Sequence, residues 1–171
     1  MTDKRGVGVC PVKDGLDGLG KVGVAVEMQF NYPVLIRQQA GDACQVSLPD
    51  FPEVGSVSST LEGALSIADD ALASAISNRI RRNQPVPLPS TVRGKAPLHR
   101  AALPALLSAK VALYLAMRHA GLSKVALARR LNHDEKEVRR LLDPSHPSKL
   151  PRIEAALAVL GMRLVIGLHQ G

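Results

Sequence analysis

Residues 123–142 read SKVALARRLNHDEKEVRRLL, and this stretch decides the fold of the C-terminal half. Apolar residues recur every three or four positions on both sides of Asn132, which predicts two amphipathic helices, Lys124–Leu131 and Glu135–Leu142. Ser123 is suited to cap the first helix, and Asp134 with Glu137 forms a capping box for the second. Asparagine tolerates a positive φ better than most residues, so we expect a tight turn between the helices. Two short helices joined in this way form a helix-turn-helix.

The apolar positions of these helices are expected to form a shared core. They are Leu122, Val125, Leu127, Ala128, Leu131, Val138, Leu141 and Leu142. Longer periodic runs predict two more helices, Ala105–Ala120 before the pair and Leu150–Leu160 after it, ended by Gly121 and Gly161 respectively. A short β-strand is expected at Arg163–Leu168.

The pattern Leu127–Leu131 followed by Glu137–Leu142 resembles the Cro/repressor-type helix-turn-helix family over about residues 105–162. The resemblance implies that Glu135–Leu142 is the recognition helix. It places Lys136 and Arg139 at base edges, while Glu135 would accept from a cytosine amino group or weaken binding. The residues implied near phosphates are Ser123, Lys124, Arg140 and Lys149.

The N-terminal half has the pattern of a small mixed domain. Short apolar runs predict strands at Tyr32–Ile36, Ala43–Leu48 and Val54–Val57. A helix is expected next, with Ser59 and Glu62 as its capping box. Its apolar stripe consists of Leu61, Leu65, Ala68, Leu72, Ile76 and Ile80. The proline-rich residues 85–90 cannot be helical and predict a fourth, extended edge segment, which gives the order β-β-β-α-β and an α+β fold class.

Charge and composition divide the chain further. Residues 91–171 hold 14 Lys/Arg against 5 Asp/Glu, a balance of +9, whereas residues 1–90 hold 8 against 10, a balance of −2. A cationic half beside a slightly anionic half indicates two tasks, one of them involving a polyanion. The predicted parts are a flexible or non-native extension at 1–27, domains at 28–90 and 105–171, and a Pro/Gly-containing linker at 91–104. Gly15–Lys21 has the spacing of a phosphate-binding loop but is followed by Val22 instead of a Ser or Thr hydroxyl. Gly18, Gly20 and Gly23 spell a second glycine motif, but no helix is predicted after it to face a phosphate.

Nothing in the sequence indicates an enzyme. Cys10 and Cys44 have no metal-ligand spacing, the histidines show none either, and the carboxylates are scattered over turns and helix faces. We therefore expect no catalytic residues, no metal and no cofactor. Without a signal peptide pattern or a membrane-spanning apolar run, a cytoplasmic protein is expected.

Several separate motifs also resemble the HicB antitoxin family. They are Tyr32–Val34, Val46–Pro52, Thr60–Leu65, Pro87–Ser90, Arg140–Pro144 and Ala155–Gly161. The resemblance implies a partial RNase-H-like domain at 28–90 that binds and neutralises a small mRNA-cleaving toxin of the HicA type. It also implies that the helix-turn-helix domain acts as a transcriptional repressor of the shared operon.

The partners follow from the same resemblance. Candidate toxin contacts are the acids Asp50 and Glu53, with Tyr32, Leu48 and Phe51 as apolar anchors. The competing interpretation is that Phe51 belongs to the core and the acids are merely solvated. A homodimer or higher oligomer is expected on operator DNA, with Ala155–Leu160 and Arg163–Leu168 as candidate dimer surfaces. A different function stays open: a stand-alone helix-turn-helix regulator whose N-terminal domain senses a ligand or only dimerises.

Overall fold

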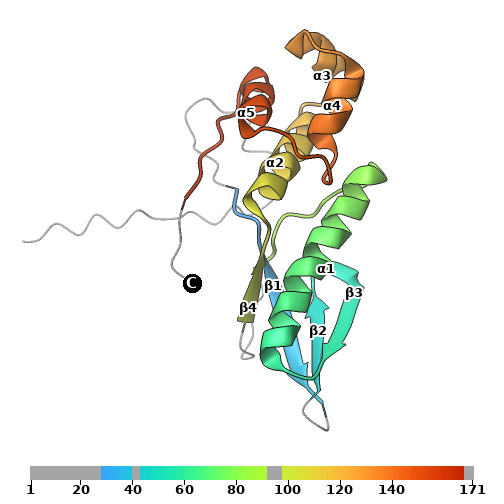
Figure 1. Cartoon of the computed structure of the whole chain (residues 1–171), viewed down its shortest axis with the longest axis vertical. Coiled ribbons are helices and arrows are strands. Elements are labelled where there is room, and N and C mark those ends of the chain that lie inside the picture. Colours follow the sequence, from blue (N-terminus) through green and yellow to red (C-terminus); the bar gives the residue numbers. More distant parts are fainter. Residues whose placement is uncertain (1–27, 40–42, 92–97, 168–171) are drawn as a thin grey trace, which may run out of the picture.

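The computed structural model describes residues 28–39, 43–91 and 98–167 (Figure 1), so the extension predicted at 1–27 lies outside the described residues. A sheet with one helix on its face forms one end of the molecule, and the remaining helices form the other end. The elements are β1 (Asn31–Gln38), β2 (Cys44–Leu48), β3 (Phe51–Ser58), α1 (Leu61–Arg81), β4 (Leu98–Ala102), α2 (Ala105–His119), α3 (Lys124–Leu131), α4 (Glu135–Leu142) and α5 (Leu150–Val159).

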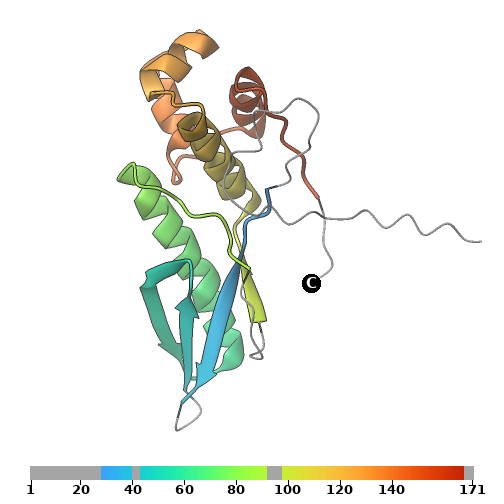
Figure 2. The same cartoon turned by 180° about the vertical axis from the view of Figure 1, so that it is seen from behind.

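The sheet has the order β3-β2-β1-β4, and every neighbouring pair is antiparallel. Helix α1 covers one face of the sheet, and Figure 2 shows the opposite face, over which no described helix lies. Alternate strand residues point to opposite faces, so one set of side chains meets the apolar side of α1. That core includes Tyr32, Val34, Val46, Leu48 and Phe51 from the strands and Ala64, Ala68, Leu72, Ala75, Ile76 and Ile80 from α1.

The start of α1 differs from the prediction in detail. The N-cap is Thr60 rather than Ser59, and its hydroxyl accepts a hydrogen bond from the Gly63 N–H at 3.1 Å. A Cβ on Gly63 would lie 2.6 Å from the Ser58 hydroxyl oxygen, so a larger residue there would displace the Ser58 side chain from the first turn. Leu61 is the first residue of α1, is 49% exposed and is not part of the buried stripe.

The predicted position of the fourth strand was wrong, although the order β-β-β-α-β is confirmed. Strand β4 is Leu98–Ala102, inside the segment that composition assigned to a linker, and it pairs with β1 from Asn31↔Ala102 to Leu35↔Leu98. Residues 85–90 contain three prolines, which cannot donate to a ladder. That segment instead buries Val86 and offers the Pro87 carbonyl to the Tyr32 hydroxyl at 2.8 Å.

The helical half follows the prediction closely. Ser123 caps α3 by accepting from the Ala126 N–H, and Asn132 ends it in the left-handed region with φ +53°. Some predictions fail in this half. Val125 is 40% exposed rather than core, and residues 163–167 form no strand, since no described strand lies beside them to supply backbone partners.

The two ends of the molecule are joined where α1 stops. The Tyr114 hydroxyl of α2 donates to the Gln84 carbonyl at 2.7 Å, and the Arg118 guanidinium donates to the Asn83 carbonyl at 3.0 Å. Asn83 itself has a φ of +55° and turns the chain away from the helix. The sheet domain therefore sits against the helical domain through specific polar contacts.

Candidate nucleic-acid interface

Helix α4 is divided into a buried side and a cationic side. Val138, Leu141 and Leu142 are buried and pack toward α3, whose Leu127 and Ala128 are buried as well. The opposite side of α4 carries exposed cations, namely Lys136, Arg139 and Arg140. The spacing of 3.6 residues per turn that buries one set necessarily projects the other into solvent.

The N-terminal turn of α4 differs from the predicted capping box. Asp134 is the N-cap residue but its side chain makes no capping hydrogen bond. Glu137 does not reach back to it, because its carboxylate is held by Arg152 of α5 and lies 3.4 Å from His133. A cation within reach is a stronger partner for a carboxylate than a neutral N–H. The pair ties the start of α5 to α4.

Arg139 forms one exposed ion pair, with Glu135. Its guanidinium lies 2.7 Å from the Glu135 carboxylate one turn earlier, and both side chains are substantially exposed, at 66% and 38%. Such exposed pairs on a helix contribute about 0.3–0.5 kcal/mol, so a better acceptor can displace Glu135. Among the described residues, Lys136 and Arg140 have no carboxylate within ion-pair distance.

One side of α4 borders a cationic hollow of about 240 Å³, which we call the Arg140 groove. Its charged lining is Arg140, Lys149, Arg152 and Glu137. The Ser148 hydroxyl donates to the Arg140 carbonyl at 3.2 Å and lies 3.2 Å from His146 Nδ1, which holds the loop over the groove. Three cations against one carboxylate favour an anion such as a phosphate.

The structure thus brings together two predicted phosphate contacts, Arg140 and Lys149, and adds Arg152, which sequence reasoning missed. Its only signal was a position three residues after Lys149 at the start of a helix. Ser123 and Lys124 lie elsewhere, beside a second and more open hollow of about 520 Å³ that also touches Arg118, Asn83 and Glu135. We call this the Lys124 hollow.

A buried lysine supports the loop that follows α4. The Lys110 side chain is fully buried, and its ammonium donates to the backbone carbonyls of Asp143 and His146. Burial lowers the pKa of Lys110, and the nearby Asp143 carboxylate opposes that shift. The sequence does not mark this residue, because a single lysine in an apolar helix does not reveal a buried partner.

The proposed apolar anchors for a partner protein are corrected by the structure. Tyr32 and Phe51 are 0% exposed and Leu48 is 1% exposed, so all three are core residues with no surface to offer. The two rings meet edge to face with centroids 5.3 Å apart, and the Arg79 guanidinium lies 5.1 Å from the Phe51 ring. Burial raises the pKa of Tyr32, and the charge of Asp50 raises it further.

The two acids predicted beside those anchors remain at the surface. Asp50 accepts from the Ser90 N–H at 3.1 Å, which fixes the start of β3 against the segment after α1. Glu53 pairs with Arg79 at 2.7 Å. Burial would raise the pKa of Glu53, but a hydrogen bond from its own backbone and the contacts with Arg79 together lower it. Glu53 therefore already forms an ion pair, whereas no described Lys or Arg lies within ion-pair distance of Asp50.

Within residues 28–39, 43–91 and 98–167, no helix has the length and hydropathy of a membrane span. Over the same ranges, His, Cys, Asp and Glu side chains nowhere gather in a group of three or more that could hold a metal ion.

Comparison with known proteins finds relatives over most of the chain. Residues 31–112 match a family described as HicB-like antitoxin of bacterial toxin–antitoxin systems. Antitoxin HicB of Pseudomonas fluorescens (strain Pf0-1) is 35% identical over 144 residues, which cover 83% of this chain and 96% of the relative. Antitoxin HicB 2 of Photorhabdus laumondii is 36% identical over 136 residues, covering 79% and 94%. Antitoxin HicB of Escherichia coli (strain K12) is 29% identical over 135 residues, covering 79% and 96%.

Proposed function

The chain belongs to the HicB-like antitoxin family of bacterial toxin–antitoxin systems, and on that premise we propose that it neutralises a HicA-like mRNA-cleaving toxin and represses its own operon. The observation that carries the second half of this proposal is the exposed cationic side of α4, bordered by the Arg140 groove. A helix of this kind, preceded by a tight turn and a second short helix, has the dimensions to enter the major groove.

In this proposal Lys136 and Arg139 read base edges. Arg139 exchanges the Glu135 carboxylate for the two acceptors of a guanine, a geometry that a guanidinium fits well. Arg140, Lys149 and Arg152 line the Arg140 groove and receive a backbone phosphate there. Ser123 and Lys124 contact the backbone on the side of the Lys124 hollow.

Operator binding by a dimer follows from the size of the site. One short recognition helix offers little surface, and two copies on an inverted repeat double it by symmetry. Exposed apolar side chains are available for such pairing on α5 and the tail after it: Val159 is 40%, Val165 80% and Ile166 62% exposed. In a fluorescence anisotropy titration, a duplex with a single half-site should accordingly bind much more weakly than the full inverted repeat.

Replacing Arg139 and Arg140 separately should give two different defects in DNA binding. Arg139→Ala is expected to lose about 1–3 kcal/mol of binding on operator DNA with much less loss on scrambled DNA, because it removes a base contact. Arg140→Ala is expected to weaken both duplexes alike and to reduce the salt dependence of log Kd by about one unit, because it removes a phosphate contact. Fluorescence anisotropy titrations over a range of KCl concentrations measure both. Wild-type affinity in both variants would show that α4 is not the recognition helix.

The toxin-neutralising half of the proposal concerns the sheet domain. Residues 28–90 carry 4 Lys/Arg and 6 Asp/Glu, so a basic toxin is electrostatically compatible. Asp50 is the candidate contact with the least internal compensation, since Glu53 is paired with Arg79. The gene neighbourhood distinguishes this proposal from a stand-alone regulator, whose gene would not adjoin a small basic reading frame of toxin size.

A further inference from the structure

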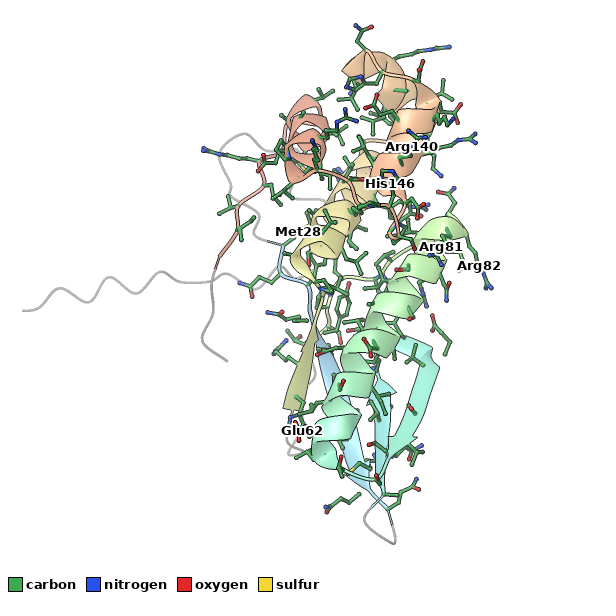
Figure 3. All side chains as sticks on the ribbon, in the orientation of Figure 1. Met28, Glu62, Arg81, Arg82, Arg140 and His146 are labelled. Atoms are coloured by element: carbon green, nitrogen blue, oxygen red, sulfur yellow. The ribbon has the colours of Figure 1, made fainter. Side chains whose placement is uncertain are left out.

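The C-terminal end of α1 belongs to the sheet domain but lies against the helical domain. The Arg81 guanidinium donates to the hydroxyl of Ser145, in the loop that follows α4. Figure 3 shows Arg81 and Arg82 at the end of α1 nearest to α4, close to the loop that carries His146 and below Arg140. With the Asn83–Arg118 and Gln84–Tyr114 hydrogen bonds, this end of α1 is fixed beside the candidate interface.

Among the residues that the structure describes, neither arginine has an anionic partner. Arg79, on the last turn of the same helix, already forms an ion pair with Glu53. Arg81 and Arg82 are exposed, and no carboxylate of the described residues lies within ion-pair distance of either one. The negative end of the helix dipole favours cations at this position but leaves most of their charge free to attract an anion.

Two hollows border α4, and Asn83, which follows Arg82 in the chain, lines one of them. At 100° per residue, Glu135 and Glu137 stand at opposite edges of the exposed ridge of α4, with Lys136, Arg139 and Arg140 between them. Glu137 borders the Arg140 groove, whereas Glu135 borders the Lys124 hollow, which Asn83 at the end of α1 also lines. Cations therefore flank the ridge on both sides, as the two phosphate backbones flank a helix in the major groove.

We propose that Arg81 and Arg82 contact the phosphate backbone of double-stranded DNA beside the loop that follows α4, where Arg81 meets Ser145, so that the sheet domain is part of the DNA-binding surface. The inference rests on the proposed operator binding by α4 and extends it to a second domain. Because phosphate contacts carry no sequence information directly, these residues contribute affinity rather than base discrimination.

Arg81→Gln/Arg82→Gln tests the inference in the full chain. The probes are a labelled duplex of the DNA immediately upstream of the gene and a scrambled duplex of equal length, titrated over a series of KCl concentrations. Two lost phosphate contacts should reduce the slope of log Kd against log salt by about two units and weaken both duplexes roughly tenfold near physiological salt. Arg37→Gln/Arg100→Gln is the matched control, because it removes the same charge from exposed residues of β1 and β4. It should change affinity less than twofold by the same titration.

Ser145→Ala separates charge from positioning, since it removes the hydrogen bond to Arg81 but keeps both cations. It should retain the wild-type salt slope, and if it reproduced the full loss of the double variant, Arg81 would act only by orienting the loop and the inference would be wrong.

A wild-type slope in Arg81→Gln/Arg82→Gln, together with lost discrimination in Arg139→Ala, would overturn this inference alone. Equal affinity of the wild-type chain for both duplexes would overturn the proposed operator binding with it.

Discussion

Lys110→Met is expected to lower the free energy of unfolding by about 2–4 kcal/mol, because the buried lysine is the hydrogen-bond donor for two backbone carbonyl oxygens. Methionine fills a similar volume but donates nothing, so the Asp143 and His146 carbonyls lose the ammonium as their donor. The loop after α4 would then lose its anchor to α2, and the Arg140 groove, which that loop lines, would lose its shape.

Urea denaturation followed by circular dichroism measures this loss. Lys136→Met is the matched control, since Lys136 is an exposed lysine on α4 and its replacement should change stability by no more than about 0.5 kcal/mol. A loss below about 1 kcal/mol in Lys110→Met would show that the carbonyls find other donors, and that Lys110 does not hold the loop.

Phe51→Ala is expected to cost about 3–5 kcal/mol of folding stability, the range for deleting a buried aromatic ring from a packed core. The ring is fully buried, meets Tyr32 edge to face and lies under the Arg79 guanidinium. The cavity would also loosen Arg79 from Glu53, since Arg79 contacts both.

Val57→Ala on the same strand provides the comparison, because that side chain is 57% exposed and should change stability by less than about 1 kcal/mol. Thermal unfolding of the wild type, Phe51→Ala and Val57→Ala measures these differences in stability. If Phe51→Ala unfolded at the wild-type temperature yet failed to bind toxin, the ring would be a surface anchor after all and its placement in the core would be wrong.

Much of the helical domain could be predicted because its signals are local. Ser123 caps the residue three positions on, and Asn132 and Gly121 adopt positive φ within one turn of the helices that they end. Strand β4 could not be predicted in the same way, because its pairing with β1 joins residues far apart in the sequence and no local pattern records the partner. Three prolines made residues 85–90 look extended, but they also removed the donors that a strand needs.

In the candidate site, too, local features could be predicted and long-range contacts could not. Helical periodicity was enough to place Lys136, Arg139 and Arg140 on the outer side of α4. The same reasoning could not tell whether Tyr32, Leu48 and Phe51 point inward or outward, because apolar residues at the ends of strands serve equally in a core or an interface. Lys110, Arg152 and Arg81 meet their partners only through tertiary contacts, so their own neighbourhoods in the sequence do not reveal those partners.

Growth of cells that express the small basic reading frame adjoining the gene, with and without this chain, tests the proposed antitoxin function most directly. We expect growth arrest from the neighbouring product alone and restored growth when the wild-type chain is co-expressed. Arg139→Ala should restore growth equally well, since it lies on the DNA-binding helix, whereas Asp50→Lys should restore it less if that loop meets a basic toxin. Persistent arrest in the presence of folded wild-type chain would contradict the account.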